Sequence, residues 1–507
     1  MTREQRLVIT IAVLASFVSF LDGTVVTVAL PAIMAELGGG LSAQQWIVDA
    51  YLITLGSLIL VAGSISDVYG RIAVMRVGLV AFGITSVAIA AAPTPELLIV
   101  ARALQGVAGA LLVPTALALI TSNFRGAAQG RAIGIWTGMT SGAMIVGPLI
   151  GGLFVDFLSW RFAFLINVLP IAVTLWLLVV LGQRDVRRPD STVDYLGAVL
   201  CTIGLGGPVF ALIESAHLGW THPAIVLSMS LGLLSFAGFL VRQRLAAQPM
   251  MPLSLFRVRN FWAGNLATAL VYAALSLNGF VIGVYLQQGA GLGATQAGLA
   301  SLPITIIMIL LSSRAGALAG RLGPRLFMTV GPIVMAGGAL LLLLVADDFS
   351  YWTQVLPGII LFGIGLALTV SPLTAAILGS IETSRSGIAS AVNNAVSRVA
   401  GLIVIAMLAV IVGGQLDLDG FHRSMIVTAV LLLIGGVVSF FGIRRPPVLD
   451  ETSTGPVGVA PSVGAAPAAA PGDSSVGDSS AGDASAGEQQ HDHGDERRDH
   501  DEKERQP

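Results

Sequence analysis

Two charged side chains lie inside long apolar stretches of this sequence, where charge is costly and usually serves a function. Asp22 is the only acid in the stretch 7–30, and Arg102 lies in the stretch 97–122. At about 1.5 Å per helical residue, Asp22 lies roughly 13 Å and Arg102 roughly 9 Å below the same end of their helices. Arginine keeps its charge at that depth and needs a partner, for which Asp22 is the candidate. Because burial and a nearby cation act in opposite directions on a carboxylate, Asp22 could exchange a proton as its surroundings change.

Asp49 and Tyr51 lie near the start of the next apolar stretch, 46–65. Asp49 is a second, reserve candidate for carrying a proton. The alternative is that it lies at the level of the lipid headgroups and has no such role. Tyr51 and Gln105 are candidates for lining a polar cavity.

A polar stripe runs along the apolar stretch 388–412. Its members recur at i, i+3, i+4, i+7, i+8 and i+11 of a helix: Ser390, Asn393, Asn394, Ser397, Arg398 and Gly401. Arg398 lies roughly 15 Å from either end of the span. Such a stripe cannot face lipid, so we expect it to line a cavity, with Asn265 and Tyr272 of the stretch 261–288. Hydrogen bonding between helices alone is the alternative.

Residues 134–152, GIWTGMTSGAMIVGPLIGG, combine an apolar composition with many glycines. Gly134, Gly138 and Gly142 recur every four residues, so they share one helix face and let a neighbouring backbone approach closely. Pro148 removes a backbone donor and predicts a bend. The simplest interpretation is a tightly packed membrane helix.

The elements that position these residues are membrane helices. The chain has 507 residues, 55% of them hydrophobic and only 11% charged, which is too little polar surface for a soluble globule of this size. Stretches long enough to cross a bilayer run approximately over 7–30, 46–65, 72–92, 97–122, 132–154, 162–181, 195–213, 223–241, 261–288, 297–313, 326–346, 352–378, 388–412 and 424–443. These fourteen spans predict an all-α membrane protein. Arginines gather in alternate loops, which places both termini in the cytoplasm.

Several functions are excluded or have no support. The only lysine is Lys503, so the spans contain no G-x-x-x-x-G-K-[ST] phosphate loop for ATP. We find no motif of an enzyme, no metal site and no cofactor site, and no nucleic-acid partner is expected. Cys201 is the only cysteine and can form no internal disulfide. The Ala-, Pro- and Gly-rich tail 446–507, acidic and containing histidines, is expected to be disordered and solvated. The alternative is that His491, His493 and His500 bind a metal ion.

Two loops have the same pattern of glycine and arginine. The first contains Gly63, Asp67, Gly70 and Arg71, and the second, 253 residues later, contains Gly316, Arg321, Gly323 and Arg325. Gly320 stands where the first copy has Asp67, so the second copy lacks the acid. Repeated halves are typical of alternating-access carriers. A turn with ordinary cytoplasmic charges is the alternative.

The first loop resembles the G-x-L-x-D-R-x-G-R motif of the major facilitator superfamily, although Ile65 and Val68 depart from it. Arg102, Gln105 and Gly106 resemble the superfamily's fourth-helix motif. The antiporter motif G-x8-G-P-x-x-G is matched by Gly138, Gly147, Pro148 and Gly151, with Gly142 on the same helix, and WRFAFLINVLP at 160–170 is similar to drug antiporters. The number of spans resembles the fourteen-helix drug:proton antiporter family.

This resemblance implies a major facilitator fold with two six-helix bundles, 1–182 and 259–445, and two additional helices within 183–258. It also implies a proton-coupled antiporter that exports hydrophobic or amphiphilic drugs across the bacterial plasma membrane as a monomer surrounded by lipid. The two glycine-rich loops would then be conformational latches. Because the spans of the second bundle contain no acid while Arg398 adds positive charge, neutral or anionic substrates are expected over cations alone. Alternatives are a dedicated exporter of one metabolite, antibiotic or lipid, an uptake symporter, or a membrane scaffold or receptor that no longer transports.

Overall fold

The computed structural model describes residues 2–183, 185, 192–382 and 386–444, and these are helical with no strand among them. The predicted disordered tail lies outside the described residues, as do the histidines at its end. Met1–Pro447 cluster as one unit. The boundaries proposed at 182 and 258 therefore remain predictions.

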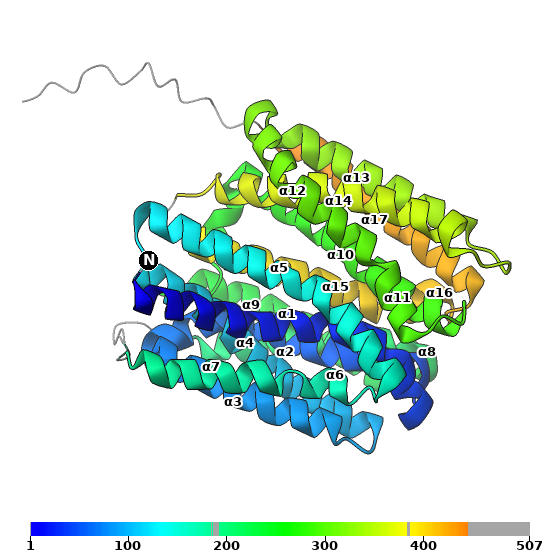
Figure 1. Ribbon diagram of the computed structural model, residues 1–507, viewed down its shortest axis with the longest axis horizontal. Coiled ribbons are helices and arrows are strands. Elements are labelled where there is room, and N and C mark those ends of the chain that lie inside the picture. Colours follow the sequence, from blue (N-terminus) through cyan, green and yellow to red (C-terminus); the bar gives the residue numbers. More distant parts are fainter. Residues whose placement is uncertain (1, 184, 186–191, 383–385, 445–507) are drawn as a thin grey trace, which may run out of the picture. The chain divides into compact units, whose positions relative to one another are not determined.

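The first group of helices is blue to cyan-green in Figure 1 and contains the residues that bond to Asp22. Its members are α1 (Arg3–Leu37), α2 (Gly40–Tyr69), α3 (Arg71–Ala90), α4 (Pro95–Asn123), α5 (Gly126–Phe157), α6 (Phe162–Leu165) and α7 (Val168–Leu181). The sixth predicted span is broken between α6 and α7, where Asn167 is fully buried. α5 is longer than predicted and continues through Pro148 as one helix of 32 residues.

Two further helices, α8 (Tyr195–Leu218) and α9 (Pro223–Leu245), form the predicted additional pair. Hydrogen bonds join α8 to α2. The Trp46 indole donates to Glu214 (2.7 Å) and Thr202 donates to Ser57 (2.9 Å), and further bonds link Ser42 with Glu214 and Tyr69 with Tyr195. α9 packs on α8 and exposes large apolar side chains such as Leu227 and Leu234. An apolar exposed face of this kind fits contact with lipid.

The second group of helices starts at the 3₁₀ turn η1 (Leu253–Arg257) and carries the polar stripe. It comprises α10 (Arg259–Gln288), α11 (Ala294–Ala300), α12 (Leu302–Leu322), α13 (Pro324–Leu341), the 3₁₀ turn η2 (Leu342–Leu344), the π-helical turn η3 (Tyr351–Val355), α14 (Leu356–Leu378), α15 (Ser386–Ala406), α16 (Leu408–Val412) and α17 (Leu418–Gly442). The predicted span 388–412 breaks after Ala406, so the stripe residues belong to α15.

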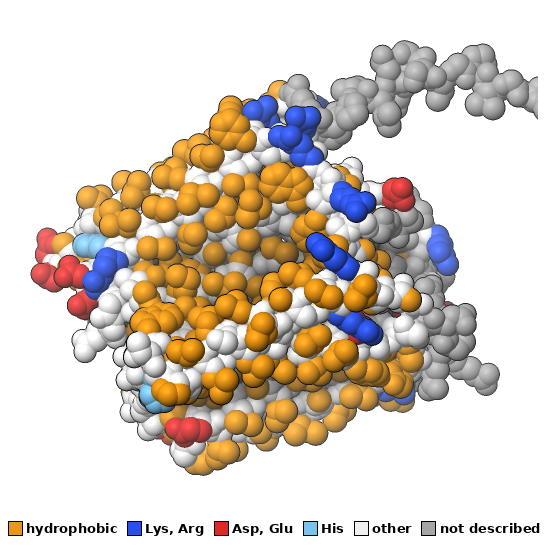
Figure 2. Space-filling model, turned by 180° about the vertical axis from the view of Figure 1, so that it is seen from behind, with side chains coloured by type: hydrophobic (Ala, Val, Ile, Leu, Met, Phe, Trp, Pro, Cys, Tyr) orange, Lys and Arg blue, Asp and Glu red, His pale blue; other side chains and the backbone are white. Residues whose placement is uncertain are grey.

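The number and polarity of the spans agree with the prediction. Thirteen helical segments among the described residues are long and apolar enough to cross a membrane. The 32-residue α5, which corresponds to the predicted span 132–154, brings the number to fourteen. Figure 2 shows a broad hydrophobic surface, with most Lys and Arg side chains at one end and most Asp and Glu side chains at the other. Following the predicted orientation, we call the end with Glu36, Asp156 and Glu214 outer and the opposite end inner.

The repeat seen in the sequence has a counterpart in the backbone. Gly70 lies between α2 and α3 with φ of 101°, and Gly323 lies between α12 and α13 with φ of 91°. Such positive φ values are easily reached only by glycine. Both copies therefore make the same tight connection, as the spacing of 253 residues predicts.

Candidate functional site

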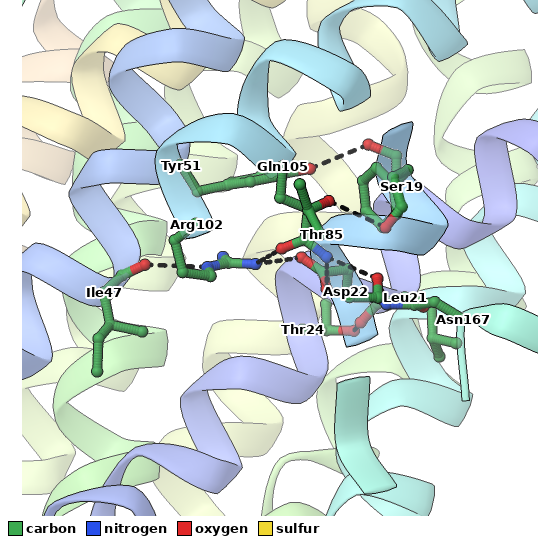
Figure 3. Close-up of polar contacts among 12 residues, drawn as sticks. Ser19, Leu21, Asp22, Thr24, Ile47, Tyr51, Thr85, Arg102, Gln105 and Asn167 are labelled. Carbon is green, nitrogen blue, oxygen red and sulfur yellow. Dashed lines mark hydrogen bonds and ion pairs between the residues drawn. The ribbon is translucent and has the colours of Figure 1, made fainter. Parts of the chain in front are cut away.

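The carboxylate of Asp22 is the centre of a buried polar cluster formed by α1, α3, α4 and the break before α7. Arg102 Nη1 donates to Oδ2 at 2.5 Å, and Gln105 Nε2 and Asn167 Nδ2 each donate to Oδ1 at 3.1 Å. Figure 3 shows these donors converging on Asp22. Asp22 is only 1% exposed, so the ion pair is shielded from water and its geometry is held by neutral donors.

Arg102 is held on several sides, which fixes the direction in which its charge points. Its Nε donates to the backbone oxygen of Ile47 at 3.1 Å, and its Nη1 also donates to Gln105 Oε1 at 2.6 Å. The guanidinium carbon lies 4.3 Å from the centre of the Tyr51 ring. A buried arginine is stable only with such partners. The pairing expected from depth alone is therefore present in the structure.

Three residues of this cluster, Asn167, Ser86 and Ser19, are not predicted from the sequence. Asn167 and Gln105 both donate to Ser86 Oγ, at 3.4 and 3.0 Å, and Ser19 Oγ lies 3.1 Å from the Tyr51 hydroxyl. Asn167 carries a usable signal, because it is the only amide in the apolar stretch 162–181. Ser19 and Ser86 carry none, since serine is common in membrane helices.

Two predicted cavity residues belong to this cluster instead. Gln105 is fully buried and all its described bonds go to Asp22, Arg102 and Ser86. Tyr51 is 2% exposed, with its ring against Arg102. Both contact the ion pair directly. Gln105 does so through hydrogen bonds to Asp22 and Arg102, and Tyr51 through its ring, which attracts the Arg102 cation.

Asp49 lies on α2 and is fully buried. Neither carboxylate oxygen has a hydrogen-bond partner among the described residues. Asp49 is therefore enclosed by protein, and its role as a reserve proton carrier stays a prediction. One turn away, the Gln45 amide donates to the backbone oxygen of Ile405 at 2.6 Å, across to the second group of helices.

The glycine face of α5 packs only in its outer half. A Cβ added to Gly147 would lie 2.0 Å from Thr24 Oγ1, and one added to Gly152 would lie 2.6 Å from Thr295 Cα of α11. A Cβ at Gly151 would touch Val25 at 3.4 Å. In contrast, a Cβ at Gly134 or Gly142 would meet nothing within 4 Å. The close approach of a neighbouring helix predicted at Gly134 and Gly142 is therefore absent in this structure. Gly138 lies outside the residues whose surroundings the structure describes.

Three side chains bond to backbone groups across the two groups of helices, all at their outer ends. Asp156 of α5 accepts hydrogen bonds from the backbone nitrogens of Ala294 and Thr295 at 2.9 and 2.8 Å, at the start of α11. Gln287 of α10 donates to the Val28 oxygen of α1 at 3.2 Å, and Gln45 makes the contact described above. The bonds of Asp156 and Gln45 use backbone groups close to helix ends, where intrahelical partners are missing. The outer ends are therefore joined in this conformation.

The two predicted latch loops differ in detail. Arg71 Nη2 pairs with Asp67 at 3.0 Å, and its Nη1 donates to the Ala118 oxygen of α4 at 3.1 Å. An unexpected acid, Asp185, accepts from the backbone nitrogens of Ile72 and Ala73 at 2.7 and 2.9 Å. It thereby caps α3.

The second latch copy packs through other contacts. Arg325 lies over the Phe440 ring at 4.4 Å, and a Cβ at Gly316 would lie 2.5 Å from Ser371 Oγ. Gly63 has open space around it. Arg321 lies in the last turn of α12, and Gly323 ends that helix.

The polar side chains along α15 fall into two sets, one that bonds to α10 and one that bonds within α15. Asn393 donates to Asn265 Oδ1 at 3.2 Å and to Thr268 Oγ1 at 2.8 Å, both on α10. Asn265 is 3% exposed, so these two predicted cavity residues instead join helices. One turn later, Arg398 Nε donates to Asn394 Oδ1 at 3.0 Å.

Ser397 and Tyr272 complete the predicted set. Ser397 donates to the Asn394 backbone oxygen at 2.8 Å. Tyr272 is partly buried, and its hydroxyl makes no hydrogen bond to a described residue. The terminal nitrogens of Arg398 on α15 and the hydroxyl of Tyr272 on α10 therefore have no hydrogen-bond partner among the described residues.

Comparisons with known proteins agree with this architecture. The family model described as Major Facilitator Superfamily matches residues 12–405. The tetracenomycin C resistance and export protein of Streptomyces glaucescens is 31% identical over 397 residues, covering 78% of this chain and 73% of the relative. The puromycin resistance protein pur8 of Streptomyces alboniger is 33% identical over 403 residues, covering 78% and 79%. The multidrug resistance protein Stp of Mycobacterium tuberculosis is 30% identical over 418 residues, covering 82% and 78%.

Solved structures with a similar fold are more distant in sequence. An auto inhibited POT family peptide transporter superposes with a TM-score of 0.65 at 16% identity, covering 89% of this chain and 98% of that one. A D-xylose-proton symporter gives 0.61 at 14% identity, covering 87% and 98%. At these identities the likeness concerns the fold alone.

Proposed function

Because this chain belongs to the major facilitator superfamily, we propose that it exports small amphiphilic compounds, antibiotics among them, in exchange for protons. The observation that carries the proposal is the sealed cluster in which Asp22 is paired with Arg102. An acid at this depth is costly and usually serves a function. Because the spans contain no phosphate loop for ATP, the proton gradient is the proposed energy source. Relatives named for resistance to tetracenomycin C, puromycin and several drugs support export as the direction.

Asp22 would carry the proton. When Asp22 is ionised, Arg102 balances its charge. The carboxylate then accepts three hydrogen bonds, one each from Arg102, Gln105 and Asn167. If rocking of the helices moves Arg102 away, the ionised form loses its compensation and a proton binds in its place. Asp49 would be a second site, because an ionised carboxylate buried without a partner is expensive, which favours a proton on it.

The turn of α1 that carries Asp22 also touches α5. Gly147 lies against Thr24, and the same helix reaches α11 through Gly152 and Asp156. A movement of α5 relative to α11 is therefore transmitted to the neighbourhood of Asp22 through direct packing. This is the physical route by which proton binding and alternating access would be linked.

The three bonds at the outer ends support a closed outer side in this conformation. Opening would break the contacts of Asp156, Gln287 and Gln45 with backbone groups, all of which water can replace. Within this proposal the protein works as a monomer in a bacterial plasma membrane, with both termini in the cytoplasm. It has no enzymatic activity and needs no metal or cofactor.

The test uses purified full-length protein in proteoliposomes that are acid inside and contain a pH-sensitive dye. Puromycin, an uncharged amphiphile and an anionic amphiphile are added outside, and proton release and substrate uptake are recorded together. Asp22→Asn is the inactive variant, and Asp419→Asn, at an exposed position with no described partner, is its matched control. Proton release that needs substrate and disappears only in Asp22→Asn supports the proposal. Uptake of substrate that is equal with and without the pH gradient contradicts it.

A further inference from the structure

The guanidinium of Arg398 is a charge near the middle of α15 without a counter-ion among the described residues. The described ion pairs are Arg71 with Asp67, Arg102 with Asp22, Arg161 with Glu36 and Arg242 with Asp194. The one hydrogen bond that Arg398 makes uses its Nε atom and the amide of Asn394 on the same helix. The two terminal nitrogens, which form the fork that binds carboxylates and sulfonates side by side, therefore have no acceptor in the described protein.

The nearest buried acids do not compensate this charge. Asp22 is already bound by Arg102, Gln105 and Asn167. The spans predicted for the second group of helices contain no Asp or Glu, and Asp419 lies at the exposed start of α17. Asp49 makes no hydrogen bond to any described residue, Arg398 included. A cation at this depth costs several kcal/mol unless something neutralises it.

The surroundings of Arg398 include a packing contact with α2 and one further donor. Gly56 of α2 faces it, and a Cβ there would lie 3.9 Å from Arg398 Cβ. Tyr51 of α2 and Tyr272 of α10 interact electrostatically with the guanidinium. Of these, Tyr51 is engaged by Ser19, whereas the Tyr272 hydroxyl has no described hydrogen bond. Arg398 and Tyr272 thus offer three donors from two helices, α15 and α10.

We infer that Arg398, assisted by the Tyr272 hydroxyl, binds the acidic group of an anionic amphiphile. This inference rests on the proposed export function and specifies its substrate class: a carboxylate, sulfonate or phosphate attached to an apolar body. The anion supplies the missing counter-charge. Such a compound has two sources, an acidic drug or an anionic lipid, and the chemistry of recognition is the same for both.

Binding is tested with two fluorescent probes that differ only in the anionic group. 8-Anilinonaphthalene-1-sulfonate carries a sulfonate, and N-phenyl-1-naphthylamine has the same rings without it. Both are titrated by calorimetry into full-length protein in detergent, against a blank of detergent micelles. We expect Arg398→Gln to weaken sulfonate binding about tenfold or more and to leave binding of the neutral probe within about twofold. Arg398→Lys, which keeps the charge without the fork, should fall between wild type and Arg398→Gln.

Two controls keep the test specific. Arg244→Gln removes an arginine at an exposed position of α9 and should leave the binding of both probes unchanged. Thermal unfolding of each variant shows that the protein remains folded. Competition by phosphatidylglycerol that requires Arg398 assigns the site to a lipid, and competition by acidic drugs alone assigns it to a drug.

Equal loss of both probes in Arg398→Gln, or sulfonate binding unaffected by it, overturns the inference. The measurement needs no gradient and no transport. A protein that binds the sulfonate through Arg398 but releases no protons would therefore contradict the proposed antiport alone. A protein that exchanges protons for neutral compounds and ignores the sulfonate would contradict the substrate class alone.

Discussion

Gly147 of α5 lies directly against Thr24 of α1, two residues beyond Asp22. A Cβ on Gly147 would be 2.0 Å from Thr24 Oγ1 and 3.0 Å from Thr24 Cβ. The Thr24 hydroxyl is itself held by the Leu21 backbone oxygen at 2.9 Å, so it cannot move away without losing that bond. The glycine of the antiporter motif is thus required where α5 meets the turn that carries the proposed proton carrier.

We expect Gly147→Ala to slow export at least about tenfold, because the added methyl group separates α5 from α1 at this contact. Adding Thr24→Ala removes the nearest atom and should restore part of the activity. Export of a fluorescent substrate from proteoliposomes measures both. Gly279→Ala, where an added Cβ meets nothing within 4 Å, is the matched control. Full activity of Gly147→Ala would show that this contact does not matter for transport.

Removing Arg102 alone should destabilise the protein more than removing both charges of the pair. Arg102→Gln leaves an unpaired buried carboxylate, which costs about 3–5 kcal/mol. The double variant Asp22→Asn with Arg102→Gln has no charge left at this pair and should regain most of the stability, yet it should not exchange protons. Thermal unfolding in detergent and proton release in vesicles are measured in parallel. Restored transport in the double variant would exclude Asp22 as the carrier.

Replacing Asp156 should open the outer side more often. In Asp156→Ala the start of α11 loses both hydrogen bonds from its cap, worth about 1–2 kcal/mol, which shifts the population by roughly five- to thirtyfold. The reporter is Thr27→Cys at the α1–α10 contact, in a Cys201→Ala background. We expect faster labelling by an impermeant maleimide added from outside. An unchanged rate would mean that this cap does not hold the outer ends together.

Asp49→Asn should fold normally, because neither oxygen of the buried carboxylate makes a hydrogen bond to the described protein. If Asp49 carries a second proton, the variant still exports through Asp22 but moves fewer protons per substrate. The ratio is obtained from the membrane potential at which net flux reverses in proteoliposomes. Either an unchanged ratio or complete loss of export would argue against a second proton site here.

Much of the fold follows from the sequence because lipid imposes a simple rule. Every backbone polar group inside a bilayer must be bonded within its own helix, so apolar length predicts the spans with errors confined to their ends and breaks. Depth is counted along a helix in the same way, and it correctly paired Asp22 with Arg102. Glycine and arginine spacing likewise predicted the repeated connections at Gly70 and Gly323.

Only the tertiary structure decided which helix faces meet. The sequence assigned Gln105, Asn265 and Asn393 to a cavity, whereas the structure gives Gln105 to the Asp22 cluster and bonds the two asparagines to each other between α15 and α10. It also brought Asn167 to Asp22 across 145 residues. Helical periodicity states which residues share a face, but which helix that face meets depends on rotation and packing of the whole bundle. For that reason, the side of α15 with free donors, where Arg398 lies, could not be told from the side that joins helices until the neighbours were in place.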